Sequence, residues 1–423
     1  MGRSFQIPYR PVGSILGEEE VQAVREAILA GGTLSCGRYR DRFEQEFAAF
    51  TGVRHAISCT NCTVALELAT SLVGLRSGDE VIATPLTYQA TIEPLLTLPV
   101  VVKFCDVDPN SLNIDPLKLA DLISPKTRAI YLVHYGGLMA DMDPVMDLAR
   151  RHGAVVIEDA AHALGSRCNG TYAGAAADFG CFSFQSMKNM TTLGEGGMLT
   201  VARDEWAENL RLLRGNEPLA KFVPRDGIRF GRHAQPARNL NRHDKNAYTH
   251  DCVELALPGT NATLSEPAAS VGSVQLRKVN GFNGRRRQIA QRLDAGLSRI
   301  PGIRVQRVPE GYTHVYHLYT FFVEPDSGLD RDEFGAALED EGVEIHLRYF
   351  PLHLLPEWRH KGHGVGECPV TERSWFEQQM NLPCYPSLRD EQVDFMIEAA
   401  QRAASRVRRQ PGQFVQGSGK VGH

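Results

Sequence analysis

The sequence lacks a long hydrophobic run, an excess of charge of one sign and the apolar core of a signal peptide. No stretch of about eighteen consecutive apolar residues occurs, so we expect no transmembrane helix. Lysine and arginine total 46 against 50 aspartate and glutamate, which gives a formal net charge of −4. This near balance provides no electrostatic argument for binding nucleic acid or an anionic membrane. With no signal-peptide pattern in its first residues, the protein is expected to be cytoplasmic.

The sequence also lacks a paired set of cysteines. Nine are present, an odd number, and several lie inside apolar, strand-like runs. Buried reduced thiols in a cytoplasmic protein explain this pattern better than a disulfide framework. Cys59 and Cys62 form a CxxC pair at a strand-to-helix junction, which taken alone is compatible with thiol redox chemistry. The preceding chain has no thioredoxin-like βαβ unit, and no second cysteine pair completes a zinc site, so we expect no metal.

What the sequence contains is a long alternation of strand and helix patterns. Strands are predicted at 55–59, 80–84, 100–105, 129–133, 155–157 and 179–184, and helices at 63–73, 88–96, 115–122 and 144–153, the last capped by Asp143. Repeated βα units predict an α/β fold with a large, doubly wound, mainly parallel sheet. No G-x-G-x-x-G motif follows the first strand, which argues against a nicotinamide dehydrogenase on such a sheet.

The second half of the chain predicts a smaller C-terminal α/β domain. It contains a long basic helix at 273–300, strand-like segments at 314–323 and 343–353, and a helix at 331–342 between them. We therefore assign residues 1–258 to an N-terminal arm and the large domain, and 259–408 to a loop, the long helix and the small domain. Residues 409–423 are polar and glycine-rich, and are expected to be a disordered tail.

Two carboxylates end the apolar run at 155–157, namely Glu158 and Asp159. They are predicted to lie at the carboxyl end of a central strand, where open α/β sheets bind ligands. Lys188 follows the apolar run at 179–184 and precedes the glycine-rich segment 194–197. Pyridoxal 5′-phosphate (PLP) requires a lysine that forms a Schiff base with its aldehyde and an acid that keeps its ring nitrogen protonated. Lys188 and Asp159 are the candidates for these two catalytic roles.

The segments EDAAHALGS and FGCFSFQSMKNMTTLGEGGM resemble the DegT/DnrJ/EryC1/StrS family of sugar aminotransferases, which are fold type I PLP enzymes. The likeness extends from about Pro8 to Ala400. It implies a PLP-dependent aminotransferase that moves an amino group from L-glutamate or L-glutamine to a keto sugar or keto cyclitol. Such reactions make aminosugars or aminocyclitols for antibiotics, other secondary metabolites or surface glycans. The resemblance also implies a homodimer in which each active site is shared between two chains.

The resemblance assigns the cofactor phosphate to the turn Asn61, Cys62 and Thr63, and to Ser183. This turn opens a helix directly after a strand, so that its free amides form an anion cradle. Cys62 stands where the family has a glycine. The other assignments rest on the same resemblance: Tyr88 stacks on the pyridine ring, His162 lies near the ring oxygen, Asn261 reaches the phosphate in the neighbouring subunit, and Tyr349 and His353 line the substrate entrance.

Other functions of the same fold remain open at this point. A sister group of sugar dehydratases has a histidine where this chain has Lys188, and a non-catalytic regulator needs neither the lysine nor Asp159. The segment 216–258 is rich in arginine, histidine and asparagine and is longer than the family's corresponding connection. Long loops in compact domains tend to be functional or mobile. We therefore have two hypotheses for it: it shapes the acceptor pocket for an anionic substrate, or it is a solvated surface excursion.

Overall fold

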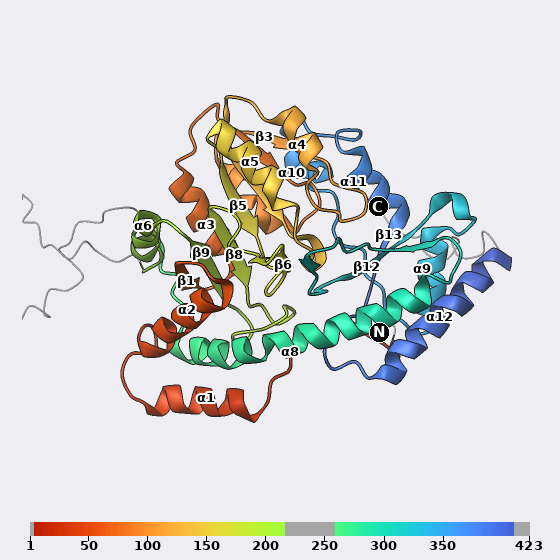
Figure 1. Ribbon diagram of the computed structural model, residues 1–423, viewed down its shortest axis with the longest axis horizontal. Helices are drawn as coiled ribbons and strands as arrows, with labels where there is room; N and C mark the ends of the chain where they lie inside the picture. The colour runs from red at the N-terminus through yellow and green to blue at the C-terminus, as the bar shows by residue number, and fades with distance from the viewer. Residues whose placement is uncertain (1–3, 216–258, 410–423) are drawn as a thin grey trace, which may run out of the picture.

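The computed structural model describes residues 4–215 and 259–409, and its largest element is a seven-stranded sheet in the order β1-β9-β8-β5-β4-β2-β3 (Figure 1). Its neighbours β2–β3, β2–β4, β4–β5 and β5–β8 pair in parallel, whereas β9 pairs antiparallel with both β8 and β1. The predicted mainly parallel sheet is confirmed. The strands are β1 (His55–Cys59), β2 (Glu80–Ala83), β3 (Val101–Phe104), β4 (Thr127–Val133), β5 (Val155–Asp159), β8 (Phe179–Ser183) and β9 (Gly197–Val201).

Helices cover both faces of this sheet. Ile130 and Val156 pack on one face with α2, α5 and the first half of α8, whereas their neighbours Tyr131 and Ile157 pack on the other face with α3 and α6. Side chains alternate between the faces of a strand, so a sheet buried on both sides requires uninterrupted apolar runs. The helices are α2 (Arg38–Thr51), α3 (Cys62–Val73), α5 (Met142–His152), α6 (Asp204–Gly215) and α8 (Glu266–Leu297).

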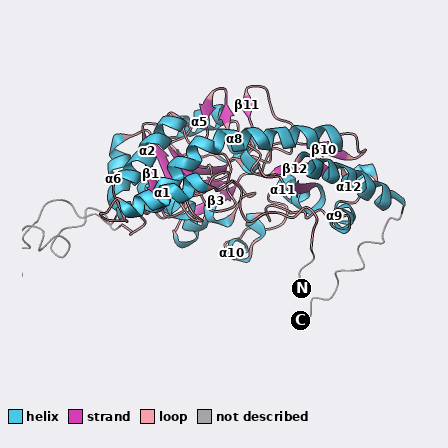
Figure 2. Ribbon diagram, turned by 90° about the horizontal axis from the view of Figure 1, so that it is seen from below, coloured by secondary structure: helices cyan, strands magenta, loops and turns pink. Residues whose placement is uncertain are grey.

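A second core lies at the other end of the molecule, around an antiparallel sheet in the order β10-β12-β13 (Figure 2). The second half of α8 packs into this core through Ile289 and Leu293, so one helix joins both cores. Ile7 of the N-terminal arm also belongs to it. The domain boundary at 258/259 stays a prediction. The elements are β10 (Ile303–Val305), β12 (Tyr319–Val323), β13 (Gln379–Leu382), α9 (Arg331–Asp340) and α12 (Asp390–Arg409).

Several expected elements differ from the structure. The helix expected at 88–96 is two short 3-10 helices, because Pro94 lacks an N–H donor and restricts the residue before it. Asp141, not Asp143, occupies the N-cap of α5, because the helix begins at Met142 and Pro144 fits inside its first turn. The strand expected at 343–353 makes only isolated bridges. The remaining elements are α1 (Glu18–Leu29), η1 (Gln89–Thr91), η2 (Glu93–Thr97), α4 (Pro116–Leu122), η3 (Tyr135–Gly137), β6 (Arg167–Cys168), β7 (Thr171–Tyr172), β11 (Tyr312–Thr313), η5 (Pro325–Ser327), η6 (Leu352–Leu354), α10 (Pro356–Arg359), α11 (Pro369–Arg373) and η7 (Ser374–Gln378).

The predictions for segment 216–258 and for the tail from residue 410 lie outside the described residues. Among the described helices, none is long and apolar enough to cross a membrane.

Candidate active site

The two carboxylates at the end of β5 point to opposite faces of the sheet. Glu158 is fully buried and accepts hydrogen bonds from His134 Nε2 (2.7 Å) and from the backbone N–H groups of Gly174 (2.8 Å) and Ala177 (2.6 Å). Through these hydrogen bonds the carboxylate of Glu158 holds the connection between β5 and β8, in which Gly174 and Ala177 lie. Because neighbouring residues in a strand face opposite ways, Asp159 is left to face the candidate site.

Asp159 faces a cavity of about 640 Å³ at the carboxyl end of the sheet. Its Oδ2 accepts a hydrogen bond from the Thr91 hydroxyl at 2.6 Å, and its Oδ1 accepts one from the N–H of Ala161 at 3.0 Å. The Cys62 thiol also donates to Oδ1 at 3.9 Å, and all three donors are neutral, so they orient the carboxylate without neutralising its charge. The cavity is lined by Asn61, Cys62, Thr63, Leu66, Thr87, Tyr88, Ala90, Val133, Asp159, Ala161, His162, Ser183, Gln185, Met187, Lys188, Glu195, His317, Arg348 and Tyr349.

Lys188 lies in the same cavity, on the loop between β8 and β9. Its Nζ has no hydrogen bond or ion pair with any described residue, and burial lowers the pKa of this amine, with the charge of Asp159 opposing the shift. An amine with a lowered pKa is neutral, and therefore nucleophilic, over a wider pH range than a solvated lysine.

Glycines at two positions let other segments of the chain pack closely against the loop that carries Lys188 and its flanking strand. A Cβ on Gly197 would lie 2.5 Å from the backbone oxygen of Asn61, so only glycine lets the start of β9 pack against the start of α3. A Cβ on Gly13 would lie 2.1 Å from the backbone oxygen of Met187, and the Gly13 N–H donates to the Ser186 oxygen at 2.8 Å. The N-terminal arm therefore forms part of the support of this loop.

Two stacked histidines form another wall of the cavity. The rings of His162 and His317 have centroids 4.3 Å apart, and His162 Nε2 lies 3.1 Å from the Tyr349 hydroxyl. Burial lowers the pKa of both histidines well below the usual value, so both are neutral near pH 7. The second ring nitrogen of His162, Nδ1, is buried and has no hydrogen-bond partner. Such an orphaned polar atom fits a polar ligand in the cavity.

The start of α3 brings backbone amides to the cavity. The Asn61 side chain caps this helix by accepting from the Val64 N–H at 2.9 Å. Thr63 and Ser183 also line the cavity, and Tyr88 is 55% exposed at its mouth. A helix N-terminus of this kind suits a phosphate group.

The structure does not support redox chemistry at the CxxC pair. Burial raises the pKa of the Cys59 thiol to about 12, and burial and the charge of Asp159 raise that of Cys62 well above its usual value. Reactive cysteines need a thiolate, which these environments disfavour. The eight described cysteines are all free, and no cluster of histidine, cysteine or carboxylate side chains in the described chain could hold a metal ion.

Two of the residues named from the sequence lie outside the cavity lining. His353 is fully buried, and its Nε2 pairs with Glu372 Oε1 at 2.9 Å, so the placement of its side chain does not support direct contact with substrate. Asn261 is exposed on this chain. Contact between Asn261 and a neighbouring subunit stays a prediction.

The cavity lining also contains residues for which the sequence predicts no role, among them His317 and Arg348. Both lie in segments that the sequence predicts as strand-like, 314–323 and 343–353, and a histidine or an arginine inside such an apolar run is a signal of a possible site. Arg348 follows the isolated bridge of His346 to Asn381 instead of lying in a regular strand.

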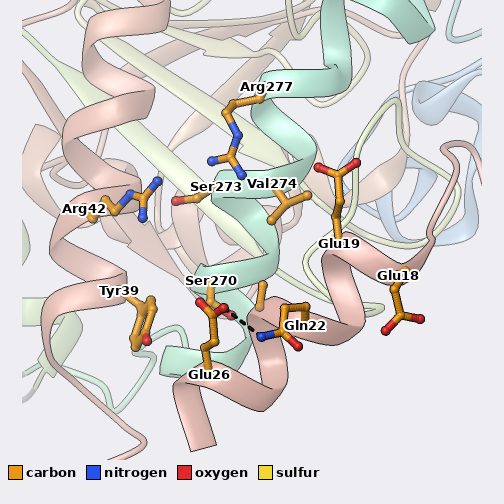
Figure 3. A pocket seen from close by; sticks show the side chains of 11 residues that line it. Glu18, Glu19, Gln22, Glu26, Tyr39, Arg42, Ser270, Ser273, Val274 and Arg277 are labelled. Carbon is orange, nitrogen blue, oxygen red and sulfur yellow. Dashed lines mark hydrogen bonds between the residues drawn. The ribbon is translucent and has the colours of Figure 1, made fainter. Parts of the chain in front are cut away.

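A second hollow, of about 430 Å³, lies between α1, α2 and α8 (Figure 3). Its labelled side chains include the carboxylates of Glu18, Glu19 and Glu26 and the guanidinium groups of Arg42 and Arg277. Gln22 Nε2 donates to Glu26 Oε1 at 2.9 Å. No lysine is among the lining residues of this hollow, whereas the cavity at Lys188 combines a lysine with the strand-end carboxylate, so the cavity at Lys188 is the candidate active site.

The mainly parallel sheet, the half-buried lysine whose amine has no partner among the described residues, the strand-end carboxylate and the helix N-terminus together define a fold type I site for PLP. The comparison with known proteins agrees. A model of the DegT/DnrJ/EryC1/StrS aminotransferase family matches residues 14–401, and the chain belongs to this family. It is accordingly a PLP-dependent aminotransferase.

Individual relatives match over nearly their whole length. The spore coat polysaccharide biosynthesis protein SpsC of Bacillus subtilis is 35% identical over 402 residues, which cover 94% of this chain and 97% of the relative. The GDP-perosamine synthase of Caulobacter vibrioides is 33% identical, covering 86% and 90%. The aminotransferase TlmJ from Streptoalloteichus hindustanus is 31% identical in sequence, and its crystal structure superposes with a TM-score of 0.81. The match covers 95% of this chain and 100% of the TlmJ chain.

Proposed function

We propose that the protein transfers the amino group of L-glutamate or L-glutamine to a keto sugar in the biosynthesis of an aminosugar, with a keto cyclitol as the other acceptor class. The observation that carries this proposal is the convergence of Lys188, Asp159 and the orphaned Nδ1 of His162 on one cavity. Amino transfer with PLP requires from the protein a lysine that holds the cofactor, a carboxylate beside the ring nitrogen and a neutral group that hydrogen-bonds to the ring oxygen.

When bound, PLP supplies an aldehyde that an amine can capture and a ring that withdraws electrons from the reacting bond. Lys188 would hold the cofactor, and its free amine would later carry a proton to and from the reacting carbon. Asp159 would place a fixed negative charge beside the ring nitrogen and keep that nitrogen protonated. The neutral His162 would use Nδ1 as a hydrogen-bond partner for the ring oxygen, and the amides at the start of α3 would bind the phosphate.

The relatives support a sugar as the acceptor. One is named as a protein of spore coat polysaccharide biosynthesis, and another is named as a synthase of GDP-perosamine. A surface glycan is therefore the destination that we favour for the product, with a secondary metabolite such as an antibiotic as the second possibility.

We also propose that the protein is a homodimer with shared sites. Asn261 is exposed on this chain, and its neighbour Ala262 is held beside the start of α3 because the backbone oxygen of Ala262 accepts from the Thr60 N–H at 3.0 Å. This placement leaves the Asn261 side chain free to reach a partner chain.

The test is the absorption spectrum of the purified protein with PLP, before and after addition of L-glutamate or L-glutamine. We expect a lysine-bound cofactor band that one donor converts to the band of the pyridoxamine form. In Lys188→Ala the band of the lysine-bound cofactor should be absent. Lys126→Ala, which replaces an exposed lysine, should give the same spectra as the unmodified protein. A lysine-independent spectrum, or no response to any amino donor, would contradict the proposed function.

A further inference from the structure

Arg348 is a cation in the cavity that the proposed cofactor roles do not use. Lys188 and Arg348 are the two lysine or arginine side chains among the described lining residues, and burial lowers the pKa of the Lys188 amine. Burial also lowers the pKa of His162 and His317 well below the usual value, so Arg348 is the permanent cation of this lining. No carboxylate of the described chain forms an ion pair with the Arg348 guanidinium, although Asp159 and Glu195 line the same cavity. A partly buried guanidinium without a carboxylate partner favours binding of an anion.

The guanidinium is held from the side of the small domain. The Arg348 guanidinium donates through Nη2 to His346 Nδ1 at 3.1 Å, and the backbone N–H of Arg348 donates to Asn381 Oδ1 at 3.1 Å, which holds the main chain beside β13. The His346 ring in turn stacks on Tyr9, with centroids 3.7 Å apart and an angle of 5° between the rings. Tyr9 belongs to the N-terminal arm, and its N–H donates to Glu344 Oε2 at 2.7 Å.

The bond to His346 uses one N–H of the guanidinium, whose central carbon lies 5.9 Å from the centre of the Tyr349 ring, so other N–H groups remain for a ligand. A guanidinium has five N–H donors in a planar fork that matches the two oxygens of a carboxylate. Arg348 also lies close enough to Lys188 for its charge to act on the lysine amine. An amino acid donor carries its α-carboxylate on the carbon that reacts, so this carboxylate must lie near Lys188 as well.

We propose that Arg348 binds a substrate oxyanion, namely the α-carboxylate of the amino donor, and that His346 is the residue that positions it. This inference rests on the proposed function and deepens it. An acidic group on the acceptor has the same chemistry, so the experiment must separate the two sources.

The first measurement is the affinity of the PLP-loaded protein for glutarate, a dicarboxylate without an amino group, determined by calorimetry. Arg348→Gln should weaken glutarate binding by about 10- to 100-fold, the range for loss of hydrogen bonds to a charged group. Arg348→Lys should recover part of this loss, because it keeps the charge but not the fork. Arg307→Gln removes the same charge from an exposed position and should bind glutarate normally. Affinity within twofold of normal in Arg348→Gln would overturn the proposal.

The second measurement separates donor from acceptor by following each half-reaction in single turnovers. We expect Arg348→Gln to raise the donor concentration needed for half-maximal rate in the first half-reaction and to leave the acceptor half-reaction of the pyridoxamine form unchanged. If only the acceptor half-reaction weakens, the oxyanion belongs to the acceptor and the donor assignment is wrong. If the unmodified protein reacts with no donor, the proposed function fails, whereas the glutarate measurement still decides whether Arg348 binds a carboxylate.

The positioning role of His346 is tested with two variants. His346→Phe keeps a ring to stack on Tyr9 but removes the acceptor for Arg348 Nη2, whereas His346→Gln keeps an acceptor and loses the stack. We expect His346→Phe to weaken glutarate binding several-fold and His346→Gln to restore much of it, with the cofactor band unchanged in both. Normal glutarate binding in His346→Phe would show that His346 does not position Arg348.

Discussion

At the scale of single residues, the charge of Asp159 acts on Lys188 as well as on the bound cofactor. Burial lowers the pKa of Lys188 from its usual 10.5, and the negative charge of Asp159 raises it in opposition. Removing that charge should therefore lower the lysine pKa further and make the neutral amine available at lower pH. The same change removes the group expected to keep the ring nitrogen protonated, so capture of the cofactor and turnover should respond in opposite directions.

We predict that Asp159→Asn captures PLP at lower pH than the unmodified protein but turns over about 100- to 1000-fold more slowly, the usual cost of losing a preorganised electrostatic contact. Capture is measured by stopped-flow absorbance of the apoprotein with PLP across a pH series, and turnover by the donor half-reaction. Glu195→Gln serves as a control, because Glu195 acts on Lys188 in the same direction with a smaller effect. A capture profile displaced to higher pH in Asp159→Asn would contradict the prediction.

The sequence predicted Asp159 and Lys188 because each follows an apolar run long enough to be recognised as a buried strand. It also indicated that the Asn61 turn opens a helix, since a helix cap is a local feature. Arg348 and His317 could not be placed in this way. Their positions depend on pairings with residues far away in sequence, such as the bridge between His346 and Asn381, which no local pattern reveals.

At the scale of elements, the same limit applies to the N-terminal arm. The arm joins the small core through the bridge between Ile7 and Val343 and then supports the lysine loop through Gly13. Neither contact has a local signature, whereas the alternation of βα units did predict the large sheet. The segment 88–96 is a different case, because the helix predicted there is interrupted at Pro94, a residue visible in the sequence.

We predict that Gly13→Ala destabilises the protein and weakens PLP binding together, because the added Cβ meets the backbone oxygens of Met187 and Lys188 at 2.1 and 2.4 Å. Backbone atoms cannot move aside cheaply, so we expect a loss of about 1–3 kcal/mol in the free energy of unfolding. Chemical denaturation and a PLP titration measure the two effects.

The matched control for this prediction is Gly281→Ala in α8, where an added Cβ meets nothing within 4 Å. An exposed glycine inside a helix lowers stability by about 0.5–1 kcal/mol relative to alanine. The Gly281→Ala variant should therefore be more stable than the unmodified protein and should bind PLP with unchanged affinity. If both alanine variants had the same stability and PLP affinity, the arm would not support the lysine loop.

At the scale of the whole molecule, the surface around α1 carries exposed apolar side chains, which support the proposed association with a second chain. Ile15, Leu16, Val21, Ile28 and Leu29 are apolar and 43–69% exposed, on or next to this helix. Grouped exposed apolar side chains of this kind usually mark an interaction surface. In the proposed homodimer such a surface would be covered, and Asn261 would complete the phosphate site of the partner.

If each active site is built from two chains, two inactive variants should restore activity when they are combined in one dimer. Lys188→Ala and Asn261→Ala should each be nearly inactive, the second through weak PLP binding. A hybrid dimer with one subunit of each kind would contain one doubly altered site and one intact site, because Lys188 and Asn261 of a site come from different chains. Mixing, unfolding and refolding the two variants in equal amounts should therefore restore about a quarter of the unmodified activity, since random pairing makes half of the dimers hybrids.

The outcome separates three arrangements of the chain. Restored activity with a dimeric mass from light scattering requires that the two residues act across the interface. A dimer without restored activity would place both residues of each site in one chain, so that Asn261 would have to reach the phosphate of its own subunit. A fully active monomer would contradict the shared site, and the apolar surface around α1 would then have to bind a different partner. The refolded unmodified protein is the control, because its recovered activity sets the level against which the hybrid is compared.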